Sequence, residues 1–129
     1  TYDPARLAIG TAVDAAAVRI HGIGAGGAGP AALGFAEADV ILLDGTQGEL
    51  LSVAEAAGTR DEAETRATRH PGALAEEMEG FAVALAASLF NVPLRIVRGA
   101  SNLAGDRDHA GWRLADALSA VRARVLELA

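Results

Sequence analysis

The chain has 129 residues, 51% of them hydrophobic and 22% charged, and its formal net charge is −6. That length fits one compact domain, which we expect to span residues 1–129. The acidic balance argues against nucleic acid or an anionic membrane surface as partners, and no stretch reaches the roughly 18 apolar residues that a membrane-spanning helix needs.

Missing and rare residue types exclude several kinds of site. Cys and Lys are absent, which excludes disulfides, thiolate metal sites and Schiff-base lysines. The histidines, His21, His70 and His109, are too scattered to predict a zinc site. We therefore expect neither a metal nor an organic cofactor. The sequence begins without the basic and apolar regions of a signal peptide, so we expect a cytoplasmic protein.

In the first third of the chain, apolar runs alternate with glycine-rich turns. Residues 7–9 predict a short buried strand, residues 12–18 the start of a helix, and residues 18–23 a second strand. Residues 31–37 predict a short helix that begins directly after a proline. Residues 38–43 form a continuous apolar run, which predicts a strand buried on both faces.

The middle of the chain predicts a weak strand followed by two helices. Residues 50–53 are the strand candidate. Thr59 is a plausible N-cap, and Glu62 three residues later completes a capping box for a helix that ends near Arg69. Residues 73–90 predict one long helix with a single apolar stripe, because apolar side chains recur there at helical spacing: Leu74, Met78, Phe81, Leu85 and Leu89.

The last third predicts a strand and a helix. Residues 94–97 are a buried strand, and Asp106 or Asp108 caps the final helix. The core positions of that helix are expected at Leu114, Leu118, Val121, Val125 and Leu128. Because strands alternate with helices throughout, we expect an α/β fold with a mostly parallel sheet flanked by helices.

A glycine motif lies between a predicted strand and a predicted helix. Gly22, Gly24 and Gly27 match the spacing with which dinucleotide-binding folds let the backbone approach a pyrophosphate, and Asp44 follows the next strand, where a ribose-binding acid would lie. The alternative is a tight crossing between elements that needs small residues. Glycine is frequent in this chain, so the motif is weak.

A second group of motifs follows residue 76. Residues 77–84 (Glu-Met-Glu-Gly-Phe-Ala-Val-Ala), 91–93 (Asn-Val-Pro) and 97–102 (Val-Arg-Gly-Ala-Ser-Asn) resemble the C-terminal half of the nucleoside phosphorylase/nucleosidase superfamily. Residues 105–108 and 112–113 resemble the futalosine hydrolases, relatives of the methylthioadenosine/S-adenosylhomocysteine nucleosidases. The similarity is strongest over residues 58–118, and the chain is shorter than the family's members.

The resemblance implies a nucleoside phosphorylase-like fold, and hydrolysis of an N-ribosidic bond through an oxocarbenium-like transition state. Glu79 would accept hydrogen bonds from the ribose hydroxyls, Met78 would pack against the sugar, and Ser101 would contact the substrate beside Asn102. Asn102 would engage the base, and an amide there suits a 6-oxopurine such as the hypoxanthine of futalosine. The resemblance also implies a role in menaquinone biosynthesis and a homodimer.

Two positions depart from the family's pattern. The water-activating glutamate falls on Ala16, and a polar residue expected near the ribose falls on Ala54. A nucleoside-binding or assembly protein without catalysis is therefore a second hypothesis, and the dinucleotide-binding module is a third. Outside the motif, Glu79 is typical of a solvated helix residue, Met78 of a core residue, and Asn102 of a turn or helix cap.

Overall fold

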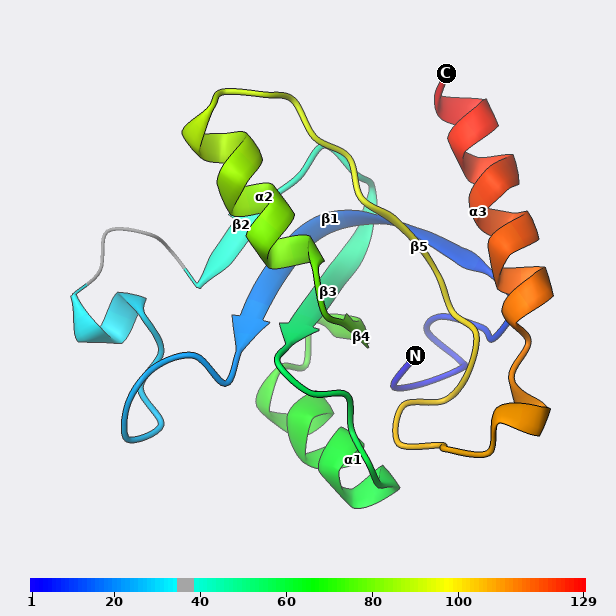
Figure 1. The fold of residues 1–129 in the computed structure, drawn as a ribbon, viewed down its shortest axis with the longest axis horizontal. Helices are drawn as coiled ribbons and strands as arrows, with labels where there is room; N and C mark the ends of the chain where they lie inside the picture. The colour runs from blue at the N-terminus through cyan, green and yellow to red at the C-terminus, as the bar shows by residue number, and fades with distance from the viewer. Residues whose placement is uncertain (35–38) are drawn as a thin grey trace.

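The computed structural model describes residues 1–34 and 39–129 of the chain (Figure 1). Its helices are α1 (Arg60–Arg69), α2 (Gly80–Leu89) and α3 (Leu114–Leu128), with short 3-10 turns at Ala31–Leu33 and His109–Gly111. The strands of the described residues are β1 (Ala12–His21), β2 (Val40–Leu42), β3 (Gln47–Val53), β4 (Ala73–Glu77) and β5 (Val97–Gly99).

The strands form a mixed, mostly parallel sheet in the order β2-β1-β3-β4, and β5 pairs with β1 outside this path. β1, β3 and β4 run parallel, whereas β2 and β5 run antiparallel to β1. β1 connects the strands: residues 12–14 pair with β5, and residues 15–21 pair with β3. The predicted α/β class with helices around a mostly parallel sheet is confirmed.

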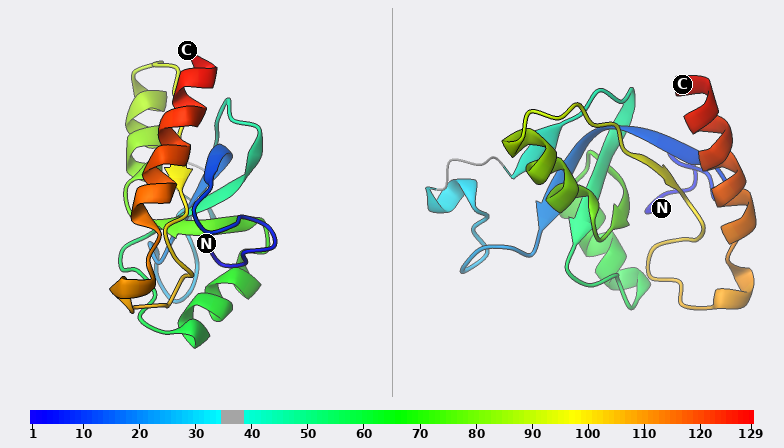
Figure 2. Two further views of the ribbon diagram at one scale, coloured as in Figure 1. Left: turned by 90° about the vertical axis from the view of Figure 1, so that its right-hand side faces the viewer. Right: turned by 45° about the horizontal axis from the view of Figure 1, so that its top comes forward.

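The two faces of the sheet carry separate hydrophobic clusters. Val18, Leu50 and Phe81 belong to the cluster beneath α2, whereas Leu51 and Ala63 belong to the cluster beneath α1. Figure 2 shows α2 and α3 on the same side of the strands, and α1 at the lower end of the molecule in both views. Leu50 and Leu51, which are neighbours in β3, therefore point to different clusters, as the period of two in a strand requires.

The prediction for the first third of the chain is partly wrong. Residues 7–9 lie in turns rather than a strand, and residues 12–18 are not helical but form most of β1. This segment is rich in Ala, which favours a helix locally, but pairing with three other strands overrides that preference.

The next two predicted elements are shorter than expected. The predicted helix at 31–37 is a 3-10 turn over Ala31–Leu33, and its last residues lie outside the described part of the chain. The predicted strand at 38–43 is β2, but it lies at the edge of the sheet, where Leu42 is 82% exposed. The expectation that both of its faces are buried is therefore wrong.

The predicted long helix over residues 73–90 is instead a strand, β4, followed by α2. β4 pairs in parallel with β3, which is buried over its last four residues. The helical spacing of the apolar side chains was therefore coincidental before Gly80. This correction moves Met78 and Glu79 from the middle of a helix into the short connection between β4 and α2.

The end of the chain is helical as predicted, but α3 packs through a different face. α3 begins at Leu114, while Asp108 caps the 3-10 turn by accepting a hydrogen bond from Ala110 N. The buried residue of α3 is Ala117, and the predicted core residue Leu118 is 61% exposed. The reason is close packing, because a Cβ on Gly99 of β5 would lie only 2.9 Å from the Cβ of Ala117.

Two predictions about local structure are confirmed. Thr59 caps α1 by accepting a hydrogen bond from Glu62 N at 3.2 Å, and α1 ends at Arg69. The weak strand candidate at 50–53 lies within β3, and these four residues are all buried. Separately, none of the helices in the described ranges has both the length and the apolar character needed to cross a membrane.

A buried ion cluster joins α3 to the sheet. Asp14 of β1 is 0% exposed, and its carboxylate pairs with Arg95, which precedes β5, and with Arg124 of α3. The hydrogen bond from Arg95 holds the pKa of Asp14 below its usual range, with help from Arg124 and against the opposing effect of burial. One carboxylate thereby fixes three segments that are distant in the sequence.

We expect Asp14→Asn to lower the free energy of unfolding by about 2–3 kcal/mol, because it removes the buried charge that pairs with both Arg95 and Arg124. Arg95 and Arg124 keep some exposure to water, which limits the loss. Urea unfolding at pH 7 measures the change. The control is Asp116→Asn, which breaks an exposed pair with Arg113 and should cost about 0.5 kcal/mol or less. Equal losses in both variants would contradict the role of Asp14.

Candidate functional site

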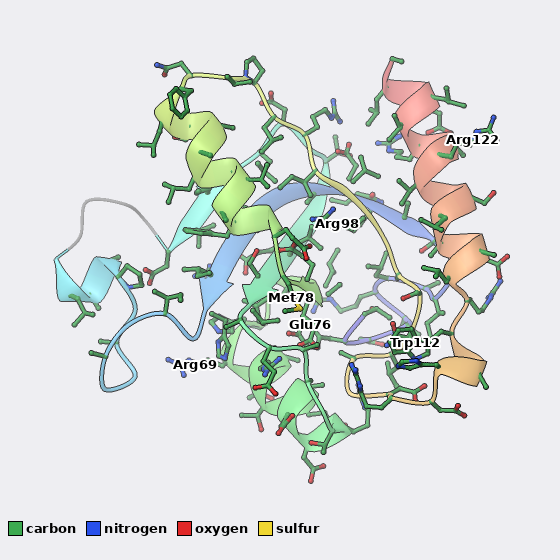
Figure 3. The ribbon with its side chains drawn as sticks, in the orientation of Figure 1. Arg69, Glu76, Met78, Arg98, Trp112 and Arg122 are labelled. Atoms are coloured by element: carbon green, nitrogen blue, oxygen red, sulfur yellow. The ribbon has the colours of Figure 1, made fainter. Side chains whose placement is uncertain are left out.

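The candidate site begins at the connection between β4 and α2. Met78 and Glu79 form this connection, and their exposed fractions are 53% for the residue Met78 and 68% for the side chain of Glu79. Figure 3 shows Met78 close to Glu76, with Arg98 above them. Both motif residues thus lie just past the carboxyl end of a parallel strand, where α/β folds bind ligands.

Glu76 belongs to the face of the sheet that α1 covers. Its carboxylate accepts hydrogen bonds from Tyr2 Oη at 3.0 Å, Arg66 Nη1 at 2.9 Å and the backbone N–H of Ala57 at 2.7 Å. Burial, together with the charge of Glu76, raises the pKa of the Tyr2 hydroxyl. Because its acceptor sites are occupied within the protein, Glu76 has a structural role.

Glu77, the next residue, faces the opposite side and organises the start of α2. Its side chain is only 8% exposed and accepts hydrogen bonds from Ser52 Oγ, from Arg98 Nη2 at 3.0 Å, and from the backbone N–H groups of Glu79 at 3.0 Å and Gly80 at 2.6 Å. Burial raises the pKa of this carboxyl, but the four donors together outweigh burial and hold the pKa below its usual range.

Gly80 is needed for this arrangement. A Cβ at position 80 would lie 2.8 Å from Glu77 Oε1, closer than real Cβ atoms approach. Glycine therefore lets the carboxylate reach the backbone N–H groups at the first turn of α2, where a negative charge also meets the positive end of the helix dipole. The Glu-Gly spacing in the motif has this physical cause.

Arg98 of β5 connects the two glutamates around the turn. Its Nη2 lies 3.0 Å from Glu77 and 3.4 Å from Glu79. The second contact is long and exposed, so Glu79 keeps most of its capacity to accept other hydrogen bonds. Arg98 thereby places the exposed carboxylate of Glu79 beside the buried one.

Asn102 lies in the loop after β5, and its side chain forms hydrogen bonds within that loop. Its Oδ1 accepts a hydrogen bond from Ser101 Oγ at 2.7 Å, and its Nδ2 donates to the backbone carbonyls of Leu103 at 3.0 Å and Asp106 at 3.4 Å. These bonds fit the turn role that Asn has outside the motif. The bond to Asp106 is long, and therefore weak.

A cavity of about 90 Å³ lies between these elements, and its lining includes Glu76, Glu77, Arg98, Ser101 and Asn102. The structure thus brings Ser101 and Asn102 to a common cavity with the two buried glutamates. Met78 and Glu79 are outside its lining, and Glu79 reaches the rim through Arg98. The proposed roles of Met78, Glu79, Ser101 and Asn102 stay predictions.

Ala16, the position on which the family's water-activating glutamate falls, lies inside a strand. Ala16 lies in the middle of β1, and its carbonyl accepts a hydrogen bond from Leu43 N at 2.9 Å. The methyl side chain of Ala16 cannot activate water. The carboxylate of Asp14, two residues earlier, forms ion pairs with Arg95 and Arg124.

The glycine motif adopts a tight turn instead of a dinucleotide site. Gly26 and Gly27 both have positive φ, as a type I′ turn requires, and Ala25 and Ala28 exchange backbone hydrogen bonds around them. A 3-10 turn follows in place of a long helix, and β2 is antiparallel to β1. The strand-helix-strand unit that dinucleotide binding needs is therefore not formed here. The expectation of a dinucleotide site at Gly22, Gly24, Gly27 and Asp44 is wrong.

Sequence reasoning missed two members of the site, Glu77 and Ser52. Glu77 lies inside the quoted motif, but its helical assignment hid that it alternates with Glu76 across a strand. Ser52 gave no signal, since only its pairing with Glu77 across β3 and β4 reveals it. Among residues 1–34 and 39–129, no three His, Asp or Glu side chains are grouped to hold a metal ion.

Comparison with known proteins identifies the family. The sequence model of the phosphorylase superfamily matches residues 23–129. The chain belongs to the phosphorylase superfamily. The chain is 46% identical to the futalosine hydrolase of Streptomyces coelicolor over an alignment of 82 residues. This alignment covers 64% of the chain and 35% of that relative. Over 71 residues the chain is 41% identical to the futalosine hydrolase of Acidothermus cellulolyticus, covering 55% of the chain and 29% of that relative.

Solved structures show the same superfamily fold at low identity. The 5′-methylthioadenosine/S-adenosylhomocysteine nucleosidase of Colwellia psychrerythraea, in complex with adenine, matches with a TM-score of 0.76 and 19% identity over 92% of the chain and 58% of that protein. The corresponding nucleosidase of Neisseria meningitidis, in complex with methylthio-immucillin-A, matches with a TM-score of 0.76 and 17% identity. That match covers 94% of the chain and 63% of that protein. The match to the curated relatives spans about a third of their length.

The two glutamates around the turn should differ in their effect on stability. We expect Glu77→Gln to lower the free energy of unfolding by roughly 2 kcal/mol, because it removes a buried charged acceptor that has four donors. Glu79→Gln should change it by about 0.5 kcal/mol or less, because that carboxylate is exposed. Urea unfolding at pH 7 gives both values.

The pH dependence provides a check on the same pair. Since the pKa of Glu77 is lowered in the folded protein, its stabilisation is complete above the unfolded pKa of about 4.3 and is lost as the pH falls through the folded pKa. The difference in stability between the wild type and Glu77→Gln should therefore shrink in acid. A difference that stays constant down to low pH would refute the ionised state of Glu77.

Proposed function

We propose that this chain forms the sugar- and base-binding part of an N-ribosyl hydrolase for a purine nucleoside with a 6-oxo group, in the manner of a futalosine hydrolase and within menaquinone biosynthesis. The observation that carries the proposal is the cavity lined by Glu77, Arg98 and Asn102, because Arg98 also contacts Glu79 of the β4–α2 turn. The similarity to two futalosine hydrolases supports the reaction and the substrate.

Glu79 is the group we propose to bind the ribose. Its carboxylate is exposed at the rim and has only a long contact with Arg98, so it can accept hydrogen bonds from two ribose hydroxyls. A negative charge there also favours the positive charge that develops on the sugar as the bond to the base breaks. Met78, exposed in the same turn, offers an apolar wall for the sugar.

Asn102 is the group we propose to engage the base. Its amide cannot act as an acid, but it can donate to the oxo group or to N7 of a 6-oxopurine. The weak bond from Nδ2 to Asp106 O is the one that a base would replace, while the bond to Leu103 keeps the side chain in place. Ser101 orients the amide by donating to Oδ1.

The cavity of about 90 Å³ is smaller than the roughly 300–1,000 Å³ of ordinary small-molecule sites, so these residues form only part of a nucleoside site. We propose that a homodimer contributes further walls. Exposed apolar side chains on α2 and α3 support an association of this kind: Val83, Leu89, Leu114, Leu118 and Leu126.

Release of hypoxanthine from futalosine or inosine by the purified protein tests the proposal. We expect Glu79→Gln to lower kcat/KM by about 10²–10³-fold, because it removes the charge that stabilises the transition state. The matched control is Glu64→Gln, an exposed carboxylate on α1, which should leave the rate unchanged. Asn102→Asp should shift the preference from hypoxanthine nucleosides toward adenosine, since Asp can protonate the leaving base. Equal loss in both Glu variants would refute the role of Glu79.

A nucleoside-binding protein without catalysis is the second candidate. It is favoured by the state of the other carboxylates: Glu76, Glu77 and Asp14 are all held in internal ion pairs and hydrogen bonds, so none is free to activate water. Thermal stabilisation by inosine that is lost in Glu79→Ala, without release of hypoxanthine, would favour this candidate over the hydrolase.

A further inference from the structure

A second and larger cavity lies at the carboxyl end of β1, away from the cavity that contains Asn102. Its volume is about 300 Å³, and glycine-rich residues 22–29 form one wall. The opposite wall carries charged and titratable side chains from β1 and from the end of α1: Arg19, His21, Arg69 and His70. Figure 3 shows Arg69 beside the carboxyl end of β1. That volume lies at the lower end of the range for small-molecule sites.

The two histidines contact each other across this cavity. His21 Nδ1 lies 3.0 Å from His70 Nε2, and the rings are nearly perpendicular, at 86°. One proton is shared in that contact, so each ring keeps a second nitrogen, His21 Nε2 and His70 Nδ1, for another partner. No hydrogen bond among the described residues uses either of these nitrogens.

The charge on this wall is positive and only partly compensated. Arg19 is neutralised by Glu49, which it contacts at 2.7 Å and 3.0 Å. Arg69 donates to the carbonyl of Gly27 at 2.9 Å, and no salt bridge among the described residues includes it. Asp39, the acidic residue of the lining, accepts a hydrogen bond from the backbone N–H of Ala31.

We propose that this cavity binds a small organic anion, whose carboxylate or phosphate group is held by Arg69, His21 and His70. The guanidinium supplies the permanent charge and a pair of donors that matches an oxyanion. The imidazole nitrogens supply further donors when protonated. The glycines within residues 22–29 carry no side chains, so at those positions the ligand can approach the backbone closely.

The surroundings of the histidines couple this binding to protons. Burial lowers the pKa of both imidazoles, and the charges of Arg66 and Arg69 lower the pKa of His21 further, while for His70 the added causes are His21, Arg19 and Arg69. Glu76 and Glu49 oppose these effects, and Asp61 and Glu62 of α1 line the neighbouring hollow at His21. A bound anion favours the protonated imidazoles, so affinity should rise as the pH falls from 8 to 6.

Proton NMR of the histidine rings tests the proposal, with sodium acetate and inorganic phosphate as probes and chloride at equal ionic strength as the reference. We expect saturable shifts of the His21 and His70 signals and an upward shift of their pKa values. His109, which lies in a 3-10 turn outside the cavity, should not respond. Acetate keeps its charge between pH 6 and 8, so its affinity isolates the protonation of the histidines.

Two arginine variants complete the experiment. Arg69→Gln should weaken binding by about tenfold, because a charge-assisted contact is lost. Arg122→Gln removes an arginine of α3 far from the cavity, as Figure 3 shows, and should leave the affinity unchanged. Tighter binding of phosphate than acetate indicates a phosphate ester as ligand, and the reverse indicates a carboxylate. Unsaturable shifts, equal shifts at all three histidines, or equal affinities in the two variants would overturn the proposal.

Discussion

The arrangement of the candidate site depends on the carboxylate of Glu77. It is almost fully buried and binds Ser52 of β3, the first backbone N–H groups of α2 and Arg98 of β5. A buried charge is unfavourable unless its acceptor sites are filled, so these contacts must form together. One side chain thereby sets where β4 ends, where α2 begins and how β5 approaches them. The motif residues take their positions from this constraint.

Three glutamates within four residues have three different roles because of the local geometry. Glu76 and Glu77 are adjacent in a strand, so they point to opposite faces and join separate networks. Glu79 lies after the strand has ended and stays exposed. On a helix, Glu76 and Glu79 would instead have shared one face. The strand therefore keeps two carboxylates in buried networks and leaves the third exposed, as the role proposed for Glu79 requires.

Structure that depends on residues close together in the sequence could be predicted, whereas the pairing of distant strands could not. The cap of α1 depends only on Thr59 and Glu62, and it was predicted correctly. Residues 12–18 and 73–77 are rich in Ala, which favours a helix locally, and only their partners in the sheet make them strands. The motif over residues 77–102 predicted the candidate site, but the contacts of Glu77 and Ser52 follow from strand register, which local patterns do not specify.

Small residues explain both the strengths and the errors of these sequence predictions. On α3 the leucines marked the expected core, yet the helix packs through Ala117 because Gly99 allows the strand to come close. Small residues also let the segment after β1 form a tight glycine turn, and this turn borders the cavity lined by His21 and His70. In a chain so rich in Ala and Gly, close backbone approach decides which faces pack. The larger apolar side chains that remain exposed on α2 and α3 are then available for association.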